Sequence, residues 1–128
     1  MLTNMRAIPS ILVIDDNGEA LEMVSSLLSI LGAKKISQAK SAEVALEILQ
    51  TETFSLIISD YRLEGMDGIQ LLEQLRAEGN QTPVLLLSGA PDRAIVTRAK
   101  HHPNVDFYGK PFEISDLVSA VERLTEAA

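Results

Sequence analysis

The sequence predicts a single α/β domain in which five parallel strands alternate with five helices. Three observations lead to this prediction: short apolar runs of strand length, apolar residues at helical spacing between the runs, and a chain of 128 residues, the size of one domain. Because alternating strands and helices are joined by right-handed crossovers, we expect a doubly wound five-stranded parallel sheet with helices on both faces.

The strands are predicted from short apolar runs. The runs at 11–14, 56–58 and 84–87 are continuously apolar, which is typical of strands buried on both faces. A mixed run at 105–108 and a more polar candidate at 35–39 suit the edges of a sheet.

The helices are predicted from apolar residues that recur on one helical face. The first helix carries Leu21, Val24, Leu28 and Leu31 and should stop at Gly32, and the third carries Leu71, Leu72 and Leu75 and should stop near Gly79. The second helix carries Ala42, Ala45, Leu46 and Leu49, with Ser41 as its expected N-cap. The fifth helix carries Ile114, Leu117, Val118, Val121 and Leu124. Pro91 and Asp92 are expected to open the fourth helix, because Pro suits its first position and Asp its positive end.

Composition restricts the function. The net charge of −7 repels phosphate backbones, so we expect no direct binding of nucleic acid. The chain has no cysteine, which fits a cytoplasmic location, and no apolar run reaches the roughly 18 residues needed to span a membrane. Residues 1–9 are expected to form an N-terminal extension, and residues 10–126 the domain.

Polar residues gather where the predicted strands end. Ligand sites in such sheets lie beyond the C-terminal ends of the strands, where Asp15, Asp16, Asp60, Ser88 and Lys110 are placed. Three carboxylates at one crevice repel one another unless a cation lies between them, and Mg²⁺ prefers oxygen ligands. Asp15 and Asp16 alone are equally consistent with a helix cap, but the complete set indicates a site.

The same residues suit phosphoryl chemistry. A carboxylate such as Asp60 can attack phosphorus and form an aspartyl phosphate. The transition state then needs a metal, a lysine and hydrogen-bond donors to neutralise its charge. A metal held by Asp16 and Asp60, the ammonium of Lys110 and the hydroxyl of Ser88 would supply these groups.

Five segments in order resemble the signature segments of response regulator receiver domains, the CheY-like domains of two-component signalling. These are 11–16, 56–60, 65–68, 84–88 and 110–112, and the resemblance covers about residues 10–126. It implies a flavodoxin-like (βα)5 fold with strand order 2-1-3-4-5. It also implies a phosphoprotein that accepts a phosphoryl group in signalling and is not an enzyme beyond its own phosphorylation and dephosphorylation.

The resemblance implies a role for each site residue. Asp60 resembles the phosphoacceptor, Asp16 the direct metal ligand and Asp15 a ligand through water, with the backbone carbonyl of Arg62 as the third protein ligand. The implied cofactor is Mg²⁺, with Mn²⁺ as a substitute.

The remaining implied roles concern the phosphoryl group and the switch. Lys110 pairs with the phosphoryl oxygens and forms a cis peptide bond with Pro111, while Ser88 and Phe107 are the switch pair. Ala90 and the Arg62 side chain line the approach to the phosphoryl group and tune its lifetime. Glu64 is a departure from the family, because such domains often carry Pro at this position.

The implied partners are a histidine kinase or phosphotransfer protein and a downstream target or output domain. The face of the fourth helix, fifth strand and fifth helix is expected to switch, and a homodimer through it is a further expectation. Its charged and polar groups would be Arg93, Arg98, Lys100, Asp106 and Tyr108. No membrane partner is expected.

Three alternatives stay open. They are an interaction module independent of phosphorylation, an Asp-nucleophile phosphohydrolase and a flavin-binding electron carrier. Arg62 stands where the hydrolase needs a second acid, and Asp15 and Asp16 occupy the flavin phosphate loop, where they would repel anions.

Overall fold

A computed structural model describes residues 10–90, 92–111 and 113–126 of the chain, and in them strands and helices alternate as predicted. The strands are β1 (Ile11–Ile14), β2 (Ile36–Ala39), β3 (Leu56–Asp60), β4 (Val84–Ser88) and β5 (Val105–Gly109). The helices are α1 (Gly18–Ile30), α2 (Ala42–Thr51), α3 (Gly68–Ala77), α4 (Arg93–Lys100) and α5 (Ile114–Glu126).

The five strands form one parallel sheet in the order β2-β1-β3-β4-β5, which confirms the expected order. The direction of strand addition reverses between β1 and β3, and sites in such sheets form at this reversal. The two polar strands, β2 and β5, lie at the edges as their composition predicted.

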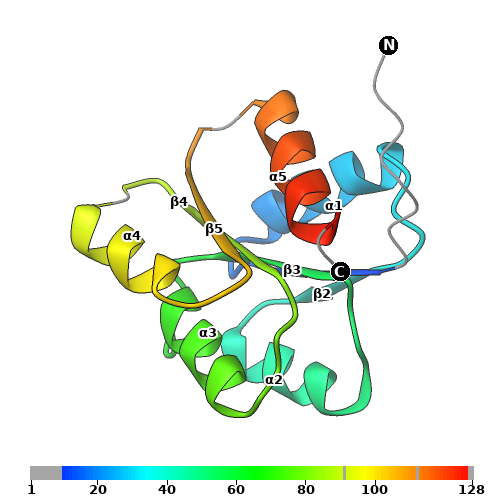
Figure 1. Cartoon of the computed structure of the whole chain (residues 1–128). Helices are drawn as coiled ribbons and strands as arrows, with labels where there is room; N and C mark the ends of the chain where they lie inside the picture. The colour runs from blue at the N-terminus through cyan, green and yellow to red at the C-terminus, as the bar shows by residue number, and fades with distance from the viewer. Residues whose placement is uncertain (1–9, 91, 112, 127–128) are drawn as a thin grey trace.

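Helices cover both faces of the sheet (Figure 1). Ile11 and Val13 of β1 point to the face under α1 and α5, whereas Leu12 and Ile14 point to the face under α2 and α3. This alternation explains the continuously apolar runs, because each central strand is buried on both sides. Burial of each large apolar side chain contributes roughly 1.5–3 kcal/mol before chain entropy is counted.

The helix caps agree with the sequence except at α4. Ser41 caps α2 as expected, since its side chain accepts the N–H of Val44. Asp92 was expected inside the first turn of α4, but it is the N-cap and accepts the N–H of Ile95, so the helix begins at Arg93. The short side chain of Asp satisfies an N–H that the helix leaves unpaired. The predicted roles of residues 1–9, Pro91 and Phe112 fall outside the described residues.

Among the helices of the described part of the chain, none combines the length and the hydropathy that crossing a bilayer requires.

Candidate functional site

The polar residues singled out in the sequence meet at one edge of the sheet. Asp15 and Asp16 directly follow β1, Asp60 ends β3, Ser88 ends β4 and Lys110 directly follows β5. Because these four strands are neighbours and parallel, their C-terminal ends lie side by side.

Three carboxylates and one ammonium form the centre of the site. Asp15, Asp16 and Asp60 each place a carboxylate oxygen so that the three atoms lie within 4.8 Å of one another. Lys110 Nζ lies 2.8 Å from Asp60 Oδ1 and 3.7 Å from Asp15 Oδ2. When all four groups are ionised, three negative charges face one positive charge, so the site attracts cations.

The pKa of Asp15 is raised in this site. Its side chain is buried, and burial raises the pKa of its carboxyl above the ordinary value. The N–H of Asn17 donates to Asp15 Oδ1 at 2.9 Å and lowers the pKa in part, while the nearby Asp60 raises it again. The ionised form of Asp15 is therefore destabilised where it stands.

The donor set fits a hard divalent cation. The three acids offer only oxygen atoms, and Asp16 is exposed enough to leave room for water ligands. Mg²⁺ is typically bound by one or two carboxylates together with several waters. The destabilised Asp15 carboxylate would also gain from a neighbouring positive charge.

Asp60 is fixed by the main chain on both sides. The N–H of Tyr61 donates to the carbonyl of Leu87 at 2.7 Å, which continues the pairing of β3 with β4 beyond Asp60. Gly68, the first residue of α3, packs so closely that a Cβ there would lie 2.7 Å from the carbonyl oxygen of Asp60 and 2.9 Å from Leu86 Cδ2. Only glycine allows α3 to begin this close to the site.

A main-chain hydrogen bond joins Ser88 at the end of β4 to Lys110 after β5. Ser88 is buried, its Oγ accepts the N–H of Ala90 at 3.2 Å, and its carbonyl accepts the N–H of Lys110 at 2.7 Å. The Lys110–Pro111 peptide bond is cis. The hydroxyl and the ammonium therefore reach the site from two strand ends joined by a short main-chain hydrogen bond.

Phe107 is buried in β5, and its ring centroid lies 6.5 Å from that of Tyr61, with the rings tilted by 47°. Tyr61 was not among the residues predicted from the sequence to belong to the site. Its position directly after Asp60 was the available signal, because that residue follows the same strand end. The residue after Asp60 and a buried residue of β5 therefore form an aromatic pair.

Arg62 and Ala90 border the same groove. The groove has a volume of about 520 Å³ and lies between the loops that follow β3 and β4. Asp16 and Asp92 also line it, and both Arg62 and Ala90 are exposed. The Arg62 side chain is thus a positive group at the entrance of an acidic site.

Several charged groups expected on the face of α4, β5 and α5 already have partners. Arg98 of α4 forms a two-pronged ion pair with Glu73 of α3, with distances of 2.6 and 2.9 Å. Asp106 and Tyr108 of β5 both contact Arg123 of α5. Only Arg93 and Lys100 of the expected five combine exposure with no ion pair or side-chain hydrogen bond in the described part of the chain.

Comparisons with known proteins agree with this geometry. A family model described as the response regulator receiver domain matches residues 11–122. The chain is 40% identical over 115 residues to the response regulator protein FleR of Pseudomonas aeruginosa, covering 88% of this chain and 24% of FleR. It is 32% identical over 114 residues to a probable chemotaxis protein CheY of Rhizobium etli, covering 88% of each chain.

Solved structures show the same fold. The receiver domain of an HD domain-containing protein from Pseudomonas fluorescens aligns with a TM-score of 0.84 at 28% identity, covering 98% of this chain and 93% of that one. The chemotaxis protein CheY4 of Vibrio cholerae aligns with a TM-score of 0.83 at 26% identity, covering 92% and 99%. The chain belongs to the response regulator receiver domain family and is a receiver domain of two-component signalling.

Proposed function

We propose that Asp60 accepts a phosphoryl group from a histidine kinase or a phosphotransfer protein. The observation that carries the proposal is the position of Lys110 Nζ, 2.8 Å from Asp60 Oδ1 in a cluster of three acids. A carboxylate such as Asp60 can attack phosphorus, and the Lys110 ammonium lies where negative charge on an incoming phosphoryl group would develop.

The transfer step is a displacement at phosphorus. One Asp60 carboxylate oxygen bonds to phosphorus while the bond from phosphorus to the donor's histidine nitrogen breaks. The electron pair stays on that nitrogen, which takes up a proton. Lys110 and the Ser88 hydroxyl then hold the phosphoryl oxygens.

Asp15, Asp16 and Asp60 would hold Mg²⁺, with the carbonyl of Arg62 as a further ligand and Mn²⁺ as a substitute. Bound Mg²⁺ would neutralise charge on the phosphoryl oxygens. Arg62 and Ala90 would set the lifetime of the phosphoryl group, because Ala90 cannot orient an attacking water and the Arg62 side chain shields the groove. These features describe a phosphoacceptor rather than an enzyme that turns over a substrate.

The switch would begin at Ser88, whose Oγ now accepts the N–H of Ala90. When the hydroxyl turns to donate to the phosphoryl group, Phe107 would fill the space beside it, and α4, β5 and α5 would present a changed face. A shift from 1:99 to 99:1 needs about 5.5 kcal/mol of differential stabilisation. Charge-assisted hydrogen bonds, each about 1.5–3 kcal/mol, reach this total with two or three contacts.

The changed face would act on a downstream target or on an output domain, or would pair with a second copy. The chain spans about a quarter of FleR and 54% of the transcriptional regulatory protein FixJ of Bradyrhizobium diazoefficiens, so these relatives extend well beyond the matched region.

The test is incubation with Mg²⁺ and a small phosphodonor, followed by intact mass measurement. We expect one added phosphoryl group on the wild type and none on Asp60→Ala or on wild type unfolded in urea. An equal gain in Asp60→Ala would refute Asp60 as the acceptor. Release of free phosphate from a generic phosphomonoester in repeated turnovers would favour the hydrolase instead.

A further inference from the structure

The loop between β3 and α3 is held by two carboxylates from elsewhere in the chain. The N–H of Glu64 donates to Asp16 Oδ2 at 3.3 Å, and the N–H of Met66 donates to Glu43 Oε2 at 3.4 Å. Within the described residues, these are the only hydrogen bonds made by the main-chain N–H groups of residues 62–66. Asp16 and Glu43 thus hold the main chain of this loop, in addition to the burial of its Leu63 side chain.

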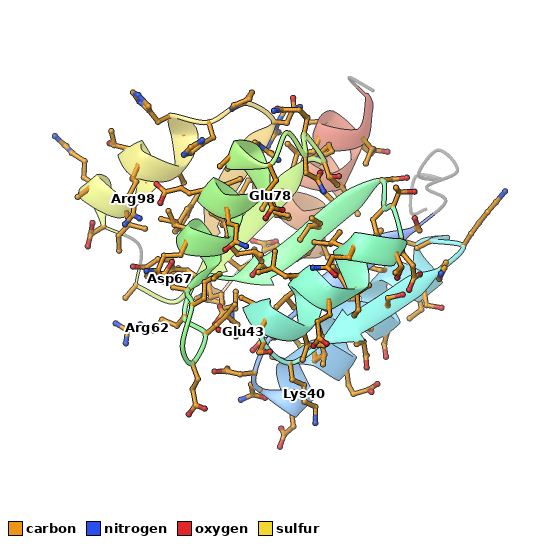
Figure 2. The ribbon with its side chains drawn as sticks, turned by 90° about the horizontal axis from the view of Figure 1, so that it is seen from below. Lys40, Glu43, Arg62, Asp67, Glu78 and Arg98 are labelled. Carbon is orange, nitrogen blue, oxygen red and sulfur yellow. The ribbon has the colours of Figure 1, made fainter. Side chains whose placement is uncertain are left out.

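Glu43 reaches the loop from the first turn of α2, where an acid also suits the positive end of the helix. Its carboxylate lies over Gly65, with Oε2 3.1 Å from the point that a Cβ would occupy. Gly65 also has φ of +78°, a conformation that favours glycine, and a Cβ there would displace the Glu43 carboxylate. Figure 2 shows Glu43 and the loop residue Arg62 at the same end of the molecule.

The contact of Glu64 with Asp16 exists because residue 64 is not proline. Proline has no main-chain N–H to donate. Asp16 is exposed, and this hydrogen bond is the one described contact that orients its carboxylate. The Glu64 side chain itself is exposed, so its contribution comes from its main chain.

We infer that Glu43 and the main-chain N–H of Glu64 clamp the loop and set the affinity of the acidic cluster for a divalent cation. The inference rests on the proposed function, because Asp16 and the Arg62 carbonyl are the cation ligands proposed there. A cation bound by both the Asp16 carboxylate and the Arg62 carbonyl requires the two groups to be in place at the same time. The clamp orders both beforehand, so less ordering is required when the cation binds. Glu43 is a positioning residue in this scheme.

The test is a Mg²⁺ titration followed by the amide resonances of the folded protein, which gives the dissociation constant directly. Glu43→Ala is expected to raise this constant about three- to tenfold, the effect of losing one hydrogen bond of ordinary strength. Glu43→Gln should restore part of the affinity, because its amide oxygen still accepts the N–H of Met66. Glu47→Ala is the matched control, since it removes an exposed acid one turn further along α2.

A second pair of variants tests the main-chain contact. Glu64→Ala removes the carboxylate but keeps the N–H, and it should bind Mg²⁺ within about twofold of wild type. Glu64→Pro removes the N–H to Asp16 and should weaken binding several-fold relative to Glu64→Ala.

The outcomes separate the two proposals. If wild type binds Mg²⁺ and Glu43→Ala matches Glu47→Ala, the clamp is refuted and the proposed function stands. If wild type shows no Mg²⁺-dependent shifts at Asp15, Asp16 or Asp60, the proposed metal site fails. Should Glu64→Pro not fold, the comparison of Glu43→Ala with Glu47→Ala decides the inference alone.

Discussion

Two glycines open helices, and the structure predicts opposite effects of replacing them with alanine. Gly18 is the first residue of α1 and Gly68 the first residue of α3, each directly after a capping side chain. A Cβ on Gly18 would meet no atom within 4 Å, whereas one on Gly68 would lie 2.7 Å from the Asp60 carbonyl oxygen, 2.9 Å from Leu86 Cδ2 and 3.1 Å from Tyr61 Cα.

The magnitudes follow from these contacts. Replacing glycine with alanine at an unstrained position stabilises a protein by about 0.4–1 kcal/mol, mainly by restricting the unfolded chain. Overpacking in a filled site costs about 1–3 kcal/mol. At Gly68 two of the three close atoms are main chain and cannot turn aside, so we expect a net loss of about 1–2 kcal/mol. Gly18→Ala should gain about 0.4–1 kcal/mol.

Urea unfolding followed by circular dichroism measures both variants at one pH. With a typical slope of about 1–3 kcal/mol per molar urea, the midpoints of the two variants should differ by about one molar, with Gly68→Ala lower. The amide resonances of Asp60 and Tyr61 should also move in Gly68→Ala. A Gly68→Ala protein as stable as Gly18→Ala would refute the claim that α3 abuts the end of β3.

Three further predictions concern the charged groups. Asp15→Asn should stabilise the protein at pH 7 without Mg²⁺, because burial raises the folded pKa of this acid and so penalises its charged form. The gain should vanish as pH falls below the unfolded pKa, which urea unfolding at several pH values would show. Glu73→Gln should lower the free energy of unfolding by about 0.5 kcal/mol and speed amide exchange in α4, whereas Glu78→Gln should not. The ion pair with Arg98 lowers the pKa of Glu73, so its contribution to stability is present above the unfolded pKa and is lost as pH falls through the folded pKa. An Arg62→Ala, Ala90→Glu double variant should lose its phosphoryl group severalfold faster than wild type, and an unchanged rate would remove the proposed tuning role.

The fold and the centre of the site were predictable because their signals are local. The apolar runs that form β1 and β4 are continuous, and the gaps between the strands carry the helical period. Once the strands were parallel, the rule for strand ends brought Asp16, Asp60 and Lys110 together without any knowledge of the loops.

The contacts that hold the loops were not predictable from the same patterns. Glu43 and Met66 are 23 residues apart, and Arg98 and Glu73 are 25 apart. An exposed acid on a helix has the same sequence signal whether it faces water or a neighbouring loop. Arg98 was expected on a free face for this reason, although its side chain turns toward α3.

The central strands are packed more firmly than α4, so a charge added at the site could alter the surface near α4 without disturbing the sheet. The central strands are buried on both faces, but α4 has a single buried residue, Ala99, and is held to α3 by an exposed ion pair. Ser88 Oγ, beside the site, is held by a single hydrogen bond from the N–H of Ala90, worth about 1 kcal/mol. On the proposed function, a phosphoryl group on Asp60 would compete with weak contacts of this kind rather than with the core, and two or three charge-assisted hydrogen bonds would supply the roughly 5.5 kcal/mol that full switching needs.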